Sequence, residues 1–230
     1  MCKIFTSAEK AKDNYLKKGV TNMAIIASNT SSESTFDPLP EGIHTAVCFG
    51  VIDMGVQEFT FEGKIIKNRK VRLVWEIPEE TYENKDGEVK IKTIGKEYTL
   101  SLHEMSNLRK ILESWRGKSF SDDELVGFDL CSILNKGCQL QIIHEKKSDK
   151  VYSKITTVIP LPKNTKIKAT YPLVYFDLSV DSLTEEMEAQ IETFSDFLKT
   201  KIRESETYLT LKYGVKHHDT DLVGDDEIPF

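Results

Sequence analysis

The sequence lacks any hydrophobic run long enough to cross a membrane. No stretch of its 230 residues approaches the ~20 consecutive apolar residues that a transmembrane helix needs. The N-terminal segment MCKIFTSAEKAKDNYLKKG carries scattered charges and has no apolar centre, so it does not have the pattern of a secretory signal. These absences predict a cytoplasmic protein that does not associate with membranes.

Cysteines are few, and none of them belongs to a CxxC pair. Their wide and irregular spacing is not that of a zinc ribbon. We therefore predict free thiols, of which two lie inside strands, and neither a metal nor another cofactor. The four residues are Cys2, Cys48, Cys131 and Cys138.

The common catalytic motifs are also missing. The sequence contains no Walker A loop, GxSxG, HExxH or zinc-deaminase motif. The acidic segment EIPEETYE lacks accompanying His or Lys residues at functional spacing, and His217, His218 and Asp219 lie together in a polar stretch without a rigid scaffold. We predict a protein that is not an enzyme, with a nuclease as the less favoured alternative.

Charge is divided unevenly along the chain. Residues 1–172 carry 26 Lys and Arg against 23 Asp and Glu, whereas residues 173–230 carry 5 against 14. A mildly basic body is therefore followed by a strongly acidic end, although the whole chain has a net charge of −6.

The first 41 residues have the composition of a flexible leader. Ser, Thr, Pro and Gly dominate from Ser28 to Gly42, and residues 8–18 could form a short helix. Met23 is an alternative start, because the globular pattern begins well after it.

Three predicted strands follow the leader. The first, from about Gly42 to Met54, is long and contains Gly50, a residue that often marks a bend or bulge inside a strand. The second, KVRLVWEIP, alternates between two faces. The third runs from about Thr93 to Leu102, after a charged hairpin whose turn is Asp86-Gly87.

The period then changes to that of a helix. Its apolar positions are three or four residues apart, and Gly117 stands where a C-terminal cap is expected. A second short helix is predicted after Ser121 as N-cap. The apolar positions of the first helix are Met105, Leu108, Ile111, Leu112 and Trp115.

Two further strands, GCQLQIIHE and KVYSKITTVIP, are joined by a short polar turn. The resulting order is three strands, a helix and two strands. This order predicts a mostly β fold of the α+β class, namely a five-stranded Greek-key barrel of the OB type, with its helix between strands three and four. We assign residues 42–163 to this domain.

Residues 164–213 are expected to form an extended segment and one C-terminal helix from about Leu183 to Glu204. The apolar stripe of this helix most simply packs on the barrel, and a contact with a second copy of the chain is the alternative. The stripe consists of Leu183, Met187, Ile191, Phe194, Leu198 and Ile202.

Residues 214–230 form a polar, acidic segment that we expect to be disordered, but it ends in an apolar triplet. An aromatic side chain beside a cluster of negative charge suits docking into a partner, where basic side chains hold the carboxylates. The expected partner-binding residues are Asp225, Asp226, Glu227, Ile228, Pro229 and Phe230.

This terminal DDEIPF resembles the acidic tip of bacterial single-stranded DNA-binding proteins. The stretches KVRLVWEIP, KEYTLSLHEMSNLRKILESWRGKSF, ELVGFDL and ITTVIPLPK resemble phage-encoded single-stranded DNA-binding proteins with an OB-fold. The resemblance covers residues 42–163, with a weaker similarity in FSDFLKTKIRESETY. It implies a protein that coats single strands during phage DNA replication and recombination, and recruits replication, recombination and repair enzymes through its tip.

Single strands are bound by cations that follow the phosphates and by aromatic faces that stack on bases. The stretch GKIIKNRKVR concentrates cations before and within the second strand, and alternation places Tyr152 and Lys154 on an outer face. Trp75 and Tyr98 are further candidates, although their alternation with apolar neighbours favours the core for both. The candidate DNA-binding residues are Lys64, Lys67, Arg69, Lys70, Arg72, Trp75, Tyr98, Tyr152 and Lys154.

One further alternative stays open. The barrel could bind no nucleic acid, so that the protein acts only as an adaptor through its tail. The sequence also leaves open whether DNA or RNA is preferred.

Overall fold

The computed structural model describes residues 37–214. The predicted leader, the alternative start at Met23, the short helix at residues 8–18 and the acidic tail lie outside these residues, apart from the last few residues of the leader and Gly214. None of the helices in the described part of the chain combines the length and the hydrophobicity that crossing a membrane requires.

The described residues form an α+β fold. The strands are β1 (Gly42–Phe61), β2 (Lys64–Glu83), β3 (Val89–Thr99), β4 (Gly137–Lys147), β5 (Lys150–Ile159) and β6 (Val174–Phe176). The helices are α2 (Asn107–Arg116), α3 (Asp122–Val126), the 3-10 helix η1 (Leu130–Ile133), α4 (Glu185–Glu192), α5 (Asp196–Glu204) and α6 (Glu206–Tyr213). The predicted order of three strands, a helix and two strands is confirmed.

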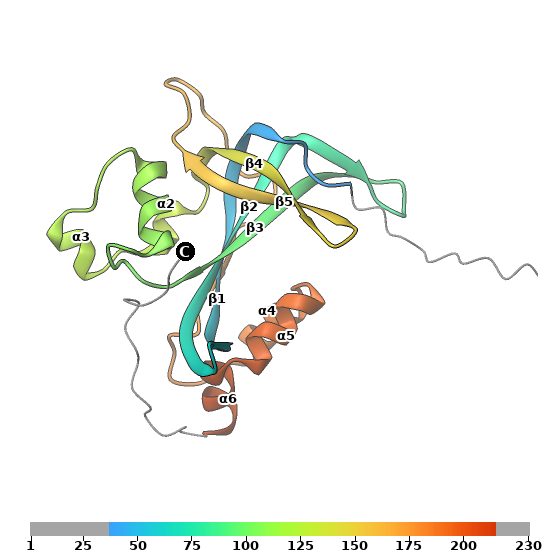
Figure 1. The fold of residues 1–230 in the computed structure, drawn as a ribbon. Helices are drawn as coiled ribbons and strands as arrows, with labels where there is room; N and C mark the ends of the chain where they lie inside the picture. The colour runs from blue at the N-terminus through green and yellow to red at the C-terminus, as the bar shows by residue number, and fades with distance from the viewer. Residues whose placement is uncertain (1–36, 215–230) are drawn as a thin grey trace, which may run out of the picture. The chain divides into compact units, whose positions relative to one another are not determined.

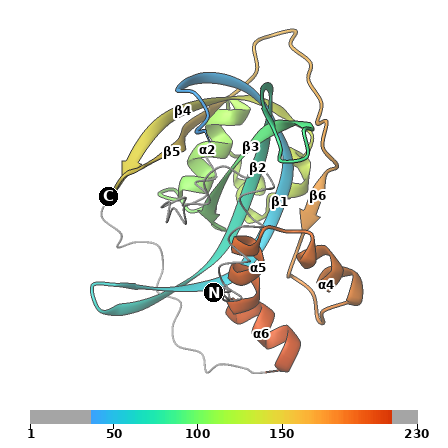
Figure 2. The same cartoon turned by 90° about the vertical axis from the view of Figure 1, so that its right-hand side faces the viewer.

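Five strands form one antiparallel sheet in the order β3-β2-β1-β4-β5, and β6 pairs with β1 in parallel (Figure 1). β1 and β2 are much longer than predicted, with 20 residues each. Their far ends form a two-stranded ribbon between Val56 and Arg69, which extends beyond the other strands (Figure 2). The basic stretch GKIIKNRKVR therefore lies within this ribbon and the β2 residues that directly follow it, and we call its five cations, from Lys64 to Arg72, the ribbon cations.

Of the expected OB-type barrel, the structure has the α+β class and the order of strands and helix, but its sheet is not closed. Within the described residues β3 and β5 form no backbone ladder with each other, so the sheet remains open between these two edges. Helix α2 packs against both strands, and β5 shifts register between Gln141 and Ile142 of its partner strand, which leaves Thr156 bulged.

The first hydrophobic core lies between one face of the sheet and helix α2. Val71, Leu73, Trp75 and Ile77 of β2 are buried there, as their alternation predicts. Helix α2 begins after its N-cap Ser106 and ends at Gly117, whose φ of 67° is the left-handed conformation that glycine adopts readily. Met105, predicted as part of the helical stripe, precedes the helix and is exposed.

The second hydrophobic core lies on the opposite face of the sheet. It joins Ile52 and Met54 of β1 to Phe176 of β6 and to Ile191 and Ile202 of the C-terminal helices. β1 supplies both cores, because Val51 points into the first and Ile52 into the second. A register shift after Cys48 leaves Phe49 outside the β1–β2 ladder, which is the bulge that Gly50 predicted.

The single predicted helix from Leu183 to Glu204 is also wrong, because the segment forms α4 and α5, followed by α6. Ser195 interrupts it, and Ser205 separates α5 from α6. Each serine has an extended backbone and accepts a hydrogen bond from the main chain of the next helix, at Leu198 N and Tyr208 N respectively. Such serine caps end one helix and begin another. The predicted burial of the apolar stripe is confirmed for Ile191, Leu198 and Ile202.

Candidate nucleic-acid interface

The cations of the β1–β2 ribbon are mostly paired with carboxylates of the same chain. Lys67 lies 3.0 Å from Glu58 and 2.9 Å from Glu206, and both carboxylates raise the pKa of Lys67, with Glu206 contributing more. Arg72 lies 3.0 Å from Glu97. Most of this predicted DNA-binding stretch therefore carries charge that the fold already compensates.

Arg69 is half-buried and belongs to a hydrogen-bonded network centred on Asp53. Its guanidinium pairs with Asp53, which raises the pKa of Arg69. The Asp53 carboxylate also accepts hydrogen bonds from the backbone N–H groups of Gly55 at 2.9 Å and Leu178 at 3.0 Å. Asp53 thus links β1 to β2, through Arg69, and to the segment after β6. Arg69 therefore has a structural role.

The remaining ribbon cations differ from one another. Lys64 is exposed. Lys70 donates a hydrogen bond to Thr99 Oγ1 at 2.7 Å, and its ammonium lies 5.5 Å from the centre of the Phe59 ring. The Arg72 guanidinium lies 5.9 Å from the Phe197 ring of α5, so the C-terminal helices partly cover this face of β2.

Trp75 and Tyr98 present no aromatic face to solvent. Trp75 is 0% exposed and Tyr98 is 3% exposed, because both side chains point into the first core. Burial raises the pKa of Tyr98. Neither ring is placed to stack on a base.

The hairpin of β4 and β5 carries a different surface, which we call the hairpin surface. Tyr152 is 49% exposed and lies opposite Glu145 in the β4–β5 register. Glu145 contacts Lys154 at 2.8 Å and Lys147 at 3.3 Å, and these two lysines lower its pKa. A single carboxylate therefore compensates the charge of two lysines here. The surface comprises Ile143, Lys147, Lys150, Tyr152 and Lys154, all exposed, whereas the exposed pair Lys146 and Val151 lies on the other face of the hairpin.

β5 leads from the hairpin surface to a pocket at the open edge of the sheet, which we call the seam pocket. It has a volume of about 320 Å³ and lies between β3, α2 and β5. Within the described part of the chain, no carboxylate lines it. The lining residues are Lys96, Tyr98, Asn107, Lys110, Ile111, Ser114, Thr156, Thr157 and Val158.

Lys96 spans the gap between the two sheet edges. Its ammonium donates a hydrogen bond to the carbonyl oxygen of Ile155 at 2.9 Å and lies 5.4 Å from the centre of the Tyr98 ring. Burial lowers the pKa of Lys96, and the nearby charge of Lys154 lowers it further. A half-buried cation beside another cation, with a neutral oxygen as its hydrogen-bond acceptor, favours an arriving anion.

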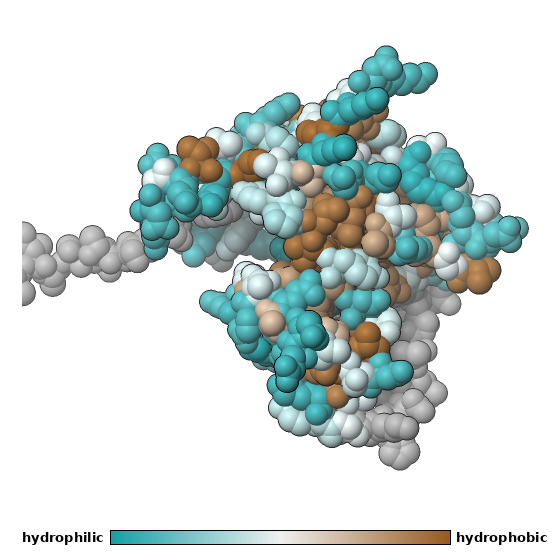
Figure 3. Space-filling view, turned by 180° about the vertical axis from the view of Figure 1, so that it is seen from behind, coloured by the Kyte–Doolittle hydropathy of each residue, from teal (hydrophilic) through white to brown (hydrophobic). Residues whose placement is uncertain are grey.

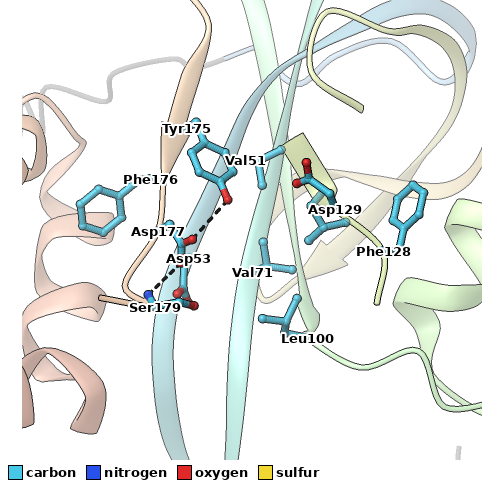
Figure 4. A pocket seen from close by; sticks show the side chains of 11 residues that line it. Val51, Asp53, Val71, Leu100, Phe128, Asp129, Tyr175, Phe176, Asp177 and Ser179 are labelled. Carbon is cyan, nitrogen blue, oxygen red and sulfur yellow. Dashed lines mark hydrogen bonds between the residues drawn. The ribbon is translucent and has the colours of Figure 1, made fainter. Parts of the chain in front are cut away.

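A second pocket, of about 190 Å³, has the opposite character (Figure 4). Asp53, Asp129 and Asp177 line it together with the aromatic rings of Phe128 and Tyr175. The carboxylate of Asp177 accepts hydrogen bonds from Ser179 N at 2.8 Å and Tyr175 Oη at 3.3 Å. An acidic lining repels phosphate, so this pocket does not suit a nucleic-acid backbone.

Hydrophobic residues gather near the middle of the face shown in Figure 3, where the sheet meets the C-terminal helices. Leu173, Tyr175 and Val180, around β6, are among the exposed hydrophobic side chains of the chain. Phe49 is half-buried, and its ring centre lies 5.5 Å from that of Tyr171. Hydrophobic surface of this kind adds nothing to phosphate binding.

Four lysines of the interface were not among the residues predicted from the sequence: Lys96, Lys110, Lys147 and Lys150. Alternation could have found Lys96, because Lys92, Ile94, Lys96 and Tyr98 share one face of β3. Its position at an open seam could not be read from the pattern, because the pattern does not show whether β3 and β5 pair with each other. The lysines of the hairpin were interpreted only as part of a polar turn.

In the described residues, no group of three or more His, Cys, Asp or Glu side chains is placed to hold a metal ion. Cys48 and Cys138 are buried free thiols inside strands, as predicted, and burial raises the pKa of Cys48 to about 12. Comparisons with protein-family models and with curated proteins find no match to this sequence.

Proposed function

We propose that the protein binds single-stranded DNA without sequence specificity and without catalysis, and recruits partner enzymes through its acidic C-terminal tip. The observation that carries the proposal is the arrangement along β5. An exposed tyrosine among lysines on the hairpin surface leads to a pocket whose described lining contains lysines and no carboxylate. Cations and an accessible aromatic face are the two elements that single-strand binding requires.

The strand order supports an OB-type fold. An OB barrel is a five-stranded, partly open Greek-key barrel. The order β3-β2-β1-β4-β5, with α2 between β3 and β4, corresponds to such a barrel opened between strands three and five. The resemblance of residues 42–163 to phage single-stranded DNA-binding proteins points the same way, and suggests phage DNA replication and recombination as the setting of the proposed activity.

The proposal is tested by fluorescence anisotropy with three labelled probes, an oligo-dT, a matched duplex and a matched RNA, at several NaCl concentrations. We expect tight binding to oligo-dT, weak binding to the duplex, and affinity that falls as salt rises, because phosphate contacts release counterions. Failure of the full chain to bind any of the three at low salt would contradict DNA binding and leave the adaptor alternative.

The proposed role of the tail needs a separate experiment. The full chain and a variant ending at Gly224 are used as baits in a bacterial extract, and captured proteins are identified by mass spectrometry. We expect replication, recombination or repair enzymes with the full chain only, because the variant lacks the acidic cluster and the terminal Phe230. Equal capture by both baits contradicts recruitment through the tip.

A further inference from the structure

The seam pocket differs from the β1–β2 ribbon in how its charge is compensated. Lys67, Arg69 and Arg72 each lie beside a carboxylate of the chain. The hydrogen-bond acceptor of Lys96 is instead the Ile155 carbonyl oxygen, which is neutral. A carbonyl satisfies a donor but cannot neutralise an ammonium, so the pocket keeps its positive charge.

The surroundings of Lys96 make this charge costly in the free protein. Burial lowers the pKa of Lys96, and Lys154 adds repulsion. Lys110 brings a further cation to the wall that α2 forms. An anion in the pocket would relieve the repulsion and raise the pKa of Lys96 again, so the pocket is preorganised for a negative group.

The pocket also offers polar side chains of suitable kind and size. Asn107, Ser114, Thr156 and Thr157 line it, and all four carry groups that can donate a hydrogen bond to an oxyanion. The hydroxyls of Ser114 and Thr156 donate to the carbonyl oxygens of Val158 at 2.7 Å and Gln141 at 3.2 Å, so each would exchange that bond for one to the anion. The volume of about 320 Å³ is at the lower end for ligand pockets, which suits a small group such as a phosphate and not a whole folded partner.

The position of the pocket relates it to the hairpin surface. Thr156 follows Tyr152 by four residues on β5, a separation of about 13 Å along an extended strand. Lys154 lies between them and is close enough to Lys96 to affect its pKa. A strand whose base stacks on Tyr152 would therefore carry its backbone toward the open seam.

We propose that the seam pocket binds a phosphodiester group of the single strand and that Lys96 is the residue that contacts it. This inference rests on the proposed function and assigns to it a site that the basic stretch of the sequence did not indicate. The seam between β3 and β5 thus serves as a backbone-binding cleft, while the ribbon cations hold the fold together.

The test compares Lys96→Gln with Lys67→Gln, which removes the same charge from a lysine already paired with two carboxylates. Affinity for labelled oligo-dT is measured across a NaCl series, after circular dichroism has shown that both variants fold. We expect Lys96→Gln to weaken binding about fivefold at low salt and to reduce the slope of log K against log salt by about 0.7, one phosphate contact. Lys67→Gln should leave the slope unchanged.

A titration with inorganic phosphate distinguishes the two possible ligands of the seam pocket, a phosphodiester of DNA and a free phosphate compound. Titration of the ¹⁵N-labelled protein with sodium phosphate, at constant ionic strength, should shift the amide signals of Thr156 and Thr157 in the unaltered chain and not in Lys96→Gln. If phosphate shifts these signals but Lys96→Gln leaves the DNA salt slope unchanged, the pocket serves a free phosphate compound and the proposal is overturned.

Two remaining outcomes distinguish failure of the seam-pocket proposal from failure of the proposed function. The seam pocket is not an anion site if Lys96→Gln leaves the salt slope unchanged and phosphate shifts no amide signal of Thr156 or Thr157. The proposed function would still stand in that case, provided that the unaltered chain binds oligo-dT. Absence of oligo-dT binding by the unaltered chain would overturn the proposed function and the phosphodiester assignment together. Lys96→Arg, which keeps the charge, should retain the slope of the unaltered chain.

Discussion

The β1–β2 ribbon and the β5 seam are both rich in cations, but they use them differently. On the ribbon, Lys67 and Arg69 lie against Glu58, Glu206 and Asp53. At the seam, Lys96 faces a carbonyl oxygen in a pocket whose described lining holds no carboxylate.

The comparison shows that the density of cations in a sequence does not measure the charge available to a ligand. Five cations in nine residues mark the ribbon in the sequence, whereas Lys96 stands alone between Gly95 and Glu97. The partners that neutralise the ribbon come from distant positions, such as Glu206 in α6. Only the fold reveals which cations are already compensated.

The largest expected effect tests the structural side of the comparison. Asp53→Ala removes a buried carboxylate and leaves Arg69 and two backbone N–H groups without their acceptor. We expect the free energy of unfolding to fall by about 3 kcal/mol. Urea denaturation measures this value, and Glu58→Gln, at an exposed carboxylate, is the control. A loss equal to that of the control would show that the network is not a stabilising element.

The next effect tests the binding side. Tyr152→Ala removes the exposed ring of the hairpin surface. Stacking contributes about 1–3 kcal/mol per base, so we expect the Kd for oligo-dT to rise about tenfold while the salt slope stays the same. Tyr152→Phe, which keeps the ring, is the matched variant and should bind like the unaltered chain. Equal weakening in both variants contradicts stacking.

A smaller effect concerns pH. Phosphate binding requires the charged form of Lys96, and burial lowers the pKa of this lysine from its ordinary value. As pH rises, the free protein loses this charge earlier than it would with an ordinary lysine, so affinity for oligo-dT should fall about threefold between about pH 7 and about pH 10. Lys96→Arg keeps its charge over this range and should lose less affinity. The two pH profiles are recorded by anisotropy, and identical profiles would refute the dependence on Lys96.

The smallest expected effect is that of Lys67→Gln on DNA binding. Both carboxylate partners already compensate this lysine, so its removal changes the local field little. We expect the Kd for oligo-dT to change less than about twofold at moderate salt. Anisotropy against the unaltered chain measures the difference. A tenfold loss of affinity would show that the ribbon belongs to the DNA interface.

The predictions from the sequence that depend on local pattern are confirmed. Alternation identified the buried face of Trp75, and helical spacing with Gly117 identified α2. The structure differs from these predictions where tertiary contacts decide the outcome. Whether the sheet closes depends on how α2 packs against β3 and β5, and the two ends of α5 depend on Ser195 and Ser205, which could equally lie inside a polar helix turn.

The predictions for the candidate site divide in the same way, into those that depend on local pattern and those that depend on tertiary contacts. Exposure of Tyr152 and Lys154 follows from alternation along β5 and is confirmed. The seam pocket could not be predicted, because its walls come from three elements that are distant in the sequence. The pairing of Lys67 with Glu206 spans 139 residues, so no local pattern contains it.

The two-sided burial of β1 has a consequence for any attempt to dissect the protein. A fragment ending after β5 would keep every strand of the antiparallel sheet but would expose Ile52 and Met54, which the C-terminal helices now cover. At Gly55, where φ is 68°, a Cβ would lie 2.5 Å from Ser205 Oγ, so the chain approaches its own helices there without room for a side chain. The smallest piece that should stay folded therefore reaches to Tyr213, and shorter pieces should aggregate through the hydrophobic face of β1 that they expose.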